Sequence, residues 1–129
     1  MTPELTVLAL AALLQIVQFL AYSVAANLQV GPRYAMGPRD TPRSLTGLAG
    51  RLQRALNNHF EGLILFTIAV LVVQLSGSAN SASAWAAWAY LGARVAYVPA
   101  YAFGLSPWRS LIWMVGLFAT LTLLLIPFF

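Results

Sequence analysis

The sequence contains no cysteine, no lysine, one histidine and only three acidic residues among its 129 positions. Without cysteine the chain can form no disulfide, no thiolate metal site and no nucleophilic thiol of its own. One histidine and three carboxylates are too few to favour a multidentate metal site within one chain, so we expect no bound metal. Any thiol chemistry must therefore come from a ligand.

Charged residues of either sign are scarce, and long hydrophobic segments make up most of the chain. Charged residues make up 8% of the chain and hydrophobic residues 60%, with a mean hydropathy of +0.79, whereas soluble domains carry about 25% charged residues. Apolar segments of about 20 residues, long enough to cross a bilayer, lie at 5–27, 55–75, 82–104 and 108–128. The sequence therefore predicts an all-α integral membrane protein: one domain over 1–129, folded as a four-transmembrane-helix bundle.

The long connection, residues 28–51, is rich in glycine and proline, which favours turns over a fifth span. All seven basic residues are arginine, and five of them lie in or beside this connection, whereas residues 74–82 carry no charge. This bias predicts that the first and third connections face the cytoplasm and that both termini lie on the other side.

Attraction to anionic membrane lipids suffices to explain Arg39 and Arg43. With no soluble basic face, no nucleic-acid partner is expected.

Polar residues of the second apolar segment share one helical face. Arg51, Arg54, Asn58 and Glu61 are spaced i, i+3, i+7 and i+10. An ionisable group within a span costs roughly 2.5–3.5 kcal/mol on insertion scales and usually faces the bundle interior or a water-filled cavity. Arg54 and Glu61 are about 10 Å apart along a helix, so they can hold the two ends of a small zwitterion. The alternative is an Arg–Glu ion pair between helices, but several arginines face one carboxylate, and an anionic ligand would balance the excess.

The third segment carries Arg94, Tyr97 and Tyr101 at i, i+3 and i+7, again on one face. A buried Arg94 needs a partner, and Glu61 is the only evident carboxylate, so we expect a structural ion pair between them. The two tyrosine hydroxyls can donate to a ligand, although tyrosine is also common at membrane interfaces.

The fourth segment begins with Ser106, Pro107, Trp108, Arg109 and Ser110, a sequence typical of a helix start. A helix N-terminus favours anions, and together with a nearby arginine it lowers the pKa of a thiol from about 8.5. We therefore expect Arg109 and the Ser110 hydroxyl to form a site for a thiolate. The alternative is that Arg109 only anchors the helix at the membrane boundary. His59 points about 100° away from Asn58 on the helix, which favours a packing or surface role.

Three motifs in this order resemble the membrane-associated proteins in eicosanoid and glutathione metabolism, in particular the small bacterial members. Residues 54–61 match the pattern Arg-Ala-x-x-Asn-x-x-Glu, and residues 92–101 and the pair Arg109-Ser110 follow at the expected spacing. Residues 37–40, Gly-Pro-Arg-Asp, also look like the bacterial branch. The resemblance covers most of the chain.

The resemblance implies a homotrimer of four-helix subunits in the bacterial inner membrane, with glutathione bound as co-substrate between subunits near the cytoplasmic side. It implies that Arg109 activates the thiolate, with Ser110 beside it. The glutathione-binding residues implied are Arg33, Arg54, Asn58, Glu61, Tyr97 and Tyr101.

Some positions depart from the prostaglandin-forming branch. That branch has Arg, His and Tyr where this chain has Asn57, Tyr97 and Trp113, which argues against prostaglandin isomerase activity. The leading hypothesis is a glutathione transferase or glutathione-dependent peroxidase acting on lipophilic electrophiles from the bilayer. The alternatives are a non-enzymatic lipid-binding or scaffolding protein and a proton-coupled exporter using Glu61.

Overall fold

The computed structural model describes residues 1–38, 40 and 44–129, and in these residues every regular element is a helix. The elements in chain order are α1 (Pro3–Val30), α2 (Pro32–Met36), α3 (Gly47–Leu75), α4 (Ser81–Ala102), α5 (Ser106–Leu125) and the short 3₁₀ helix η1 (Ile126–Phe128). The predicted all-α class is thus confirmed. Arg39 and Arg43, assigned above to contacts with lipid headgroups, lie outside the described residues.

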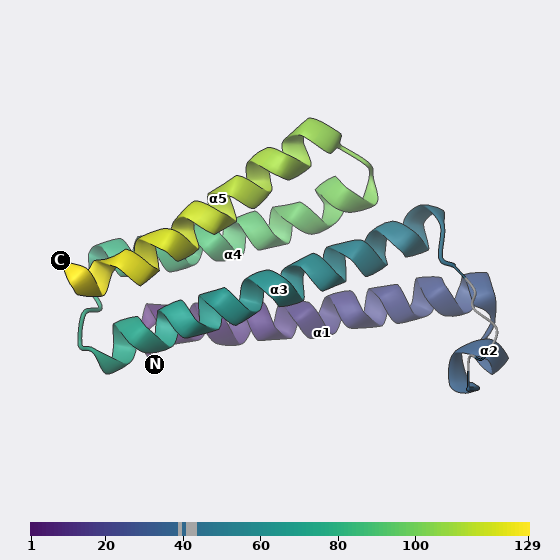
Figure 1. Ribbon diagram of the computed structural model, residues 1–129, viewed down its shortest axis with the longest axis horizontal. Coiled ribbons are helices and arrows are strands. Elements are labelled where there is room, and N and C mark those ends of the chain that lie inside the picture. The colour runs from purple at the N-terminus through teal and green to yellow at the C-terminus, as the bar shows by residue number, and fades with distance from the viewer. Residues whose placement is uncertain (39, 41–43) are drawn as a thin grey trace.

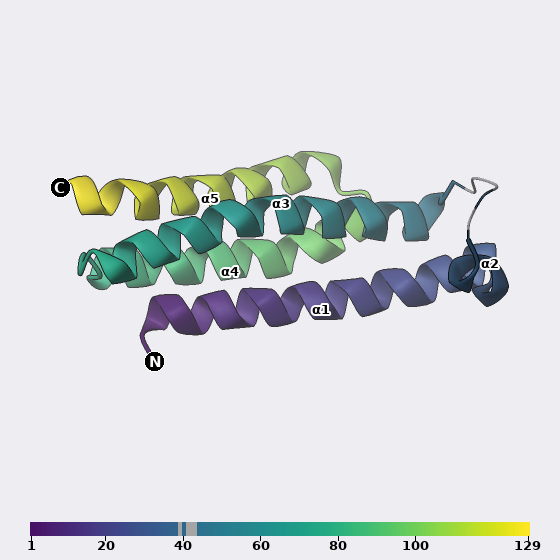
Figure 2. The same ribbon diagram turned by 60° about the horizontal axis from the view of Figure 1, so that its bottom comes forward.

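Four long helices lie side by side and alternate in direction, and α2 lies at one end of them (Figure 1). Both termini lie at the opposite end, as the rotated view in Figure 2 also shows. Helix α4 packs against α1, α3 and α5, whereas α5 packs against α3 and α4. The ends of α4, α5 and α3 that lie toward α2 carry most of the predicted site.

Three helices are apolar and long enough by composition to cross a membrane: Pro3–Val30, Gly47–Leu75 and Ser106–Phe128. The fourth predicted span corresponds to α4, which forms as a helix but is less apolar. Its alanines are only weakly hydrophobic, and Ser81, Ser83 and Arg94 lower its hydropathy further. Because α4 packs against three other helices, its polar groups can be covered by protein rather than lipid.

The beginning of α3 differs from the prediction. The helix starts at Gly47 and not near residue 55, so part of the expected 28–51 connection is helical, and α2 forms within it as well. At Gly50 a Cβ atom would lie 2.9 Å from the carbonyl oxygen of Leu45. This glycine therefore permits the preceding segment to pack closely over the first turn of α3 instead of breaking the helix.

The core lies toward the termini and joins all four long helices. It includes Val7 and Ala11 of α1, Val70 of α3 and Leu123 of α5, each almost completely buried. Phe66 and Tyr90 stack face to face across α3 and α4, with ring centroids 3.9 Å apart. Many large apolar side chains on the outer faces remain exposed, as expected when lipid is the surrounding solvent.

A buried carboxylate links the helix ends near the termini. Glu4 of α1 is 2% exposed and accepts hydrogen bonds from Gln74 Nε2 (3.1 Å) and from Ser83 Oγ. Both Glu4 and Ser83 lie in the first turns of their helices, where the partial positive charge favours an anion. This contact holds α1 and α4 together at the end of the bundle away from the candidate site.

Candidate functional site

Two arginines flank one tyrosine ring where α3, α4 and α5 meet. Arg54 Nε of α3 donates to Tyr101 Oη at 3.2 Å, and its Cζ lies 5.8 Å from the centre of that ring. Arg109 of α5 lies with its Cζ 4.7 Å from the same ring centre. The aromatic ring attracts both guanidinium groups and thus keeps two like charges close together.

The local sequence explains why these three helix ends converge. Gly104 adopts a φ of 69°, a conformation that glycine accepts readily, and it connects α4 to α5 within a short turn. Pro107 lies in the first turn of α5, where a missing N–H costs nothing. Arg51 Nε donates to the carbonyl oxygen of Ala102 at 2.8 Å, so α3 satisfies one of the free carbonyls at the end of α4.

A cavity of about 270 Å³ opens at this point and brings together most of the predicted site residues. Its lining residues are Arg54, Asn58, Tyr97, Tyr101, Arg109, Ser110 and Trp113. Both charged residues in this lining are arginines. The first turn of α5 adds the partial positive charge of a helix N-terminus. The cavity is therefore suited to an anionic group.

Tyr97 is the most deeply buried tyrosine of this cavity, at 4% exposed. Its ring meets that of Tyr101 edge to face, with centroids 5.6 Å apart, and Arg94 Cζ lies 4.6 Å from its centre. The tyrosine pair thus connects the exposed Arg54 and the half-buried Arg109 of the cavity to the buried Arg94. The predicted shared face of Arg94, Tyr97 and Tyr101 is present in the structure.

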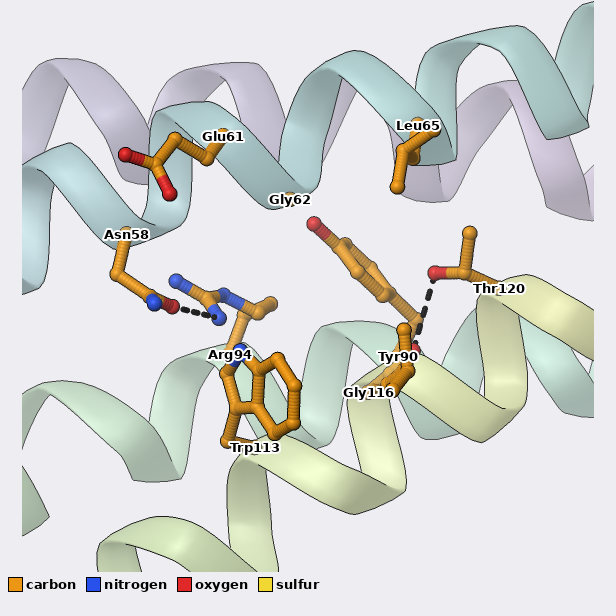
Figure 3. Close-up of a pocket in the computed structure, with 10 residues that line it drawn as sticks. Asn58, Glu61, Gly62, Leu65, Tyr90, Arg94, Trp113, Gly116 and Thr120 are labelled. Carbon is orange, nitrogen blue, oxygen red and sulfur yellow. Dashed lines mark hydrogen bonds between the residues drawn. The ribbon is translucent and has the colours of Figure 1, made fainter.

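Glu61 lines an adjoining cavity instead. This second cavity, of about 200 Å³, shares Asn58 and Trp113 with the first (Figure 3). Asn58 therefore lies between the arginines on one side and Glu61 on the other, which keeps the predicted order along α3. A ligand extending across Asn58 would meet positive charge at one end and negative charge at the other.

The predicted ion pair between Arg94 and Glu61 does not form. Arg94 Nη1 donates to Asn58 Oδ1 at 3.0 Å, and Arg94 Nε donates to His59 Nδ1 at 3.3 Å. Amide and imidazole acceptors, together with the ring of Tyr97, thus take the place of the expected carboxylate. The prediction considered only carboxylates as partners, whereas the Asn58 amide, about one turn before Glu61 on α3, supplies an acceptor to Arg94.

His59 was assigned a packing or surface role from the sequence, and no role in the site. It is completely buried, so the packing role is correct and the surface alternative is wrong. Because Nδ1 accepts from Arg94, Nε2 carries the proton and donates to the carbonyl oxygen of Ala11 at 3.0 Å. His59 thus connects α1 to Arg94 and fixes the orientation of that side chain behind the cavity. A polar residue on an otherwise apolar face of α3, away from the arginine stripe, was the available signal.

Arg33 lies apart from these residues within the chain. It belongs to the short helix α2, is exposed, and lines neither of the two cavities. One chain therefore gathers Arg54, Asn58, Tyr97, Tyr101, Arg109 and Ser110 around one cavity and places Glu61 and Arg94 at the next.

A model of the MAPEG family matches residues 4–129, essentially the whole chain. No curated protein and no solved structure matches.

Proposed function

The chain belongs to the MAPEG family, and from this premise we propose that it is a membrane-embedded glutathione transferase or glutathione-dependent peroxidase acting on lipophilic electrophiles. The family includes both activities as well as non-enzymatic members. The observation that carries the proposal is the cavity in which Arg54 and Arg109 flank Tyr101.

The residues present fit a tripeptide with two carboxylates, one amine and one thiol. Arg54 offers a positive charge, Asn58 an amide and Glu61 a negative charge along one face of α3. Arginine binds carboxylates in a bidentate manner, and a glutamate can accept hydrogen bonds from an ammonium group. We assign these three residues to glutathione binding, with Tyr97 and Tyr101 donating from α4.

Arg109 and Ser110 are assigned to the sulfur. In this position the Arg109 guanidinium and the N-terminus of α5 favour a thiolate over a thiol, and the Ser110 hydroxyl can donate to it. In conjugation by substitution, the sulfur forms a bond to the electrophilic carbon, the leaving group departs with its bonding electron pair (chloride in the case of 1-chloro-2,4-dinitrobenzene), and the thiol proton is released to solvent. In peroxide reduction, two thiols and one hydroperoxide give a disulfide, an alcohol and water. Arg109 and Ser110 would lower the barrier of either reaction by ionising and positioning the nucleophile.

A homotrimer in the bacterial inner membrane completes the proposal, with the site toward the cytoplasm. Six alanines recur along α4 at intervals of three or four residues. Three of them, Ala86, Ala93 and Ala100, are buried within the chain, whereas Ala82, Ala89 and Ala96 are exposed. Exposed small residues at this spacing permit close contact with a helix of another subunit. In such a trimer, Arg33 would reach the site from a neighbouring subunit.

Two assays on the purified protein in detergent test this proposal. With glutathione, the protein should conjugate 1-chloro-2,4-dinitrobenzene or reduce cumene hydroperoxide, each reaction being followed by absorbance. The faster reaction identifies the dominant chemistry. Absence of both activities, in protein whose helical content is intact by circular dichroism, would contradict the enzyme assignment and favour a scaffolding role.

The exporter alternative is tested separately. It requires Glu61 to exchange protons, which Glu61→Gln would prevent. Substrate uptake into proteoliposomes that depends on a pH gradient and disappears in Glu61→Gln would replace the present proposal.

A further inference from the structure

The second cavity contains polar groups to which the proposed function gives no role. It lies between α3 and α5, and side chains of α4 form its floor (Figure 3). At about 200 Å³ it is smaller than the roughly 300–1,000 Å³ of pockets that enclose whole ligands. A cavity of this size admits one end of a molecule whose remainder stays outside.

Two buried donors on the floor have no hydrogen-bond partner among the described residues. They are Tyr90 Oη and Arg94 Nη2, and their residues are only 2% and 4% exposed. Buried polar groups in proteins are rarely left without partners, because each such group loses its hydrogen bonds to water. Both side chains line the cavity, so an occupant can supply the missing acceptor.

Gly62 of α3 leaves the space in front of these donors open. A Cβ atom at this position would lie 3.5 Å from Tyr90 Oη and 4.0 Å from Arg94 Nη1. Figure 3 shows the Tyr90 hydroxyl directed toward Gly62, across the gap between α4 and α3. The glycine thus lets an acceptor approach the hydroxyl from the side of α3.

The walls of the cavity are apolar and open outward. Leu65 of α3 and Trp113 and Leu117 of α5 line it, and all three are exposed on the outside of the chain. A molecule dissolved in the membrane could enter between these side chains and place its polar end on the floor.

The charge of the cavity selects among polar ends. Glu61 and Arg94 both line it, so its two charged groups are of opposite sign. An anion without a positive charge of its own would lie beside the Glu61 carboxylate, and like charges at such close range repel. A neutral oxygen acceptor avoids this repulsion and still satisfies Tyr90 and Arg94.

We propose that this cavity binds the neutral oxygen of a lipophilic molecule, either a carbonyl or a hydroperoxide, through Tyr90 Oη and Arg94 Nη2. The inference rests on the proposed function in that it identifies this molecule as the electrophilic substrate. The shared residues Asn58 and Trp113 place it next to the cavity of Arg109.

A matched pair of probes tests the inference without glutathione. Fluorenone carries a carbonyl oxygen, and fluorene has the same shape without it. In a full-length background with Trp85, Trp88 and Trp108 replaced by phenylalanine, quenching of Trp113 reports occupation of the cavity. We expect fluorenone to bind roughly fivefold more tightly than fluorene, the effect of one hydrogen bond, and Tyr90→Phe to abolish this preference.

Control variants separate binding from folding. Tyr22→Phe, in α1 and outside this cavity, should retain the preference for fluorenone. Tyr90→Phe should unfold at no lower temperature than its parent, because the hydroxyl it removes has no partner and the stack on Phe66 remains. Gly62→Ala should weaken fluorenone binding, whereas Gly92→Ala, where a new Cβ meets nothing within 4 Å, should not.

The two sources of the oxygen are distinguished by competition against fluorenone. Cumene hydroperoxide that competes better than cumene in the parent, but not in Tyr90→Phe, would identify the hydroperoxide class as the ligand. A preference for neither oxygenated probe, or a preference that persists in Tyr90→Phe, would overturn the inference. Because glutathione is omitted, this result is independent of whether glutathione binds and therefore of the proposed function.

Discussion

Replacing Arg109 with alanine should slow thiol conjugation about 20-fold near neutral pH, and the loss should shrink as the pH rises. A free thiol has a pKa of about 8.5, and a nearby arginine lowers it by one to several units. If the pKa of the bound thiol is lowered by about two, the thiolate fraction at neutral pH rises from a few per cent to most of the thiol. Losing this increase slows the reaction by about 20-fold. Arg54 remains on the other side of the Tyr101 ring and preserves part of the effect. Above the pKa of the free thiol, both proteins would hold a thiolate and the rates would converge.

The assay is the pH profile of kcat/KM for 1-chloro-2,4-dinitrobenzene in wild type, Arg109→Ala and Arg109→Lys. The lysine variant retains a positive charge and should lie between the other two. The fold should persist, because the contact that Arg109 makes with the ring of Tyr101 is worth only about 0.5–2 kcal/mol. Full activity in Arg109→Ala, or a loss of equal size at every pH, would refute the assignment of Arg109 to thiolate stabilisation.

Three further predictions concern stability. His59→Ala should cost about 2–4 kcal/mol, because it opens a cavity and removes the acceptor of Arg94 Nε, and thermal unfolding in detergent would measure it. Glu4→Ala should cost about 1–3 kcal/mol, because it removes the acceptor of Gln74 Nε2 and one of the two acceptors of Ser83 Oγ, and a double-mutant cycle with Ser83→Ala should show coupling. Phe66→Ala should cost about 3–5 kcal/mol through loss of buried area and of its ring stack, and Phe66→Leu clearly less. Unchanged unfolding temperatures would contradict each of these.

The number and type of the long helices could be predicted from the sequence because apolar length alone specifies them. The bounds of α4 and α5 follow from local signals, such as the Asn80 cap and Pro107. The start of α3 could not be predicted, because Gly50 functions through a contact with Leu45 that depends on how the preceding segment packs. Composition suggested a break where tertiary contact permits a helix.

The candidate site was partly predictable for a similar reason. Helical spacing placed Arg54 and Asn58 on one face of α3, and Tyr97 and Tyr101 on one face of α4. The structure brings these two faces together around one cavity. Spacing within a helix carries no information about partners on another helix. The bonds of Arg94 to Asn58 and His59 were therefore missed, because they depend on the rotation of α4 against α3.

The most direct test of the central claim is calorimetric titration of reduced glutathione into the purified protein, with Glu61→Gln as the isosteric control. The account predicts saturable binding to the wild type and binding weaker by roughly tenfold or more in the variant, since a hydrogen bond to a charged group is lost. Absence of saturable binding to the wild type at millimolar glutathione would contradict the account.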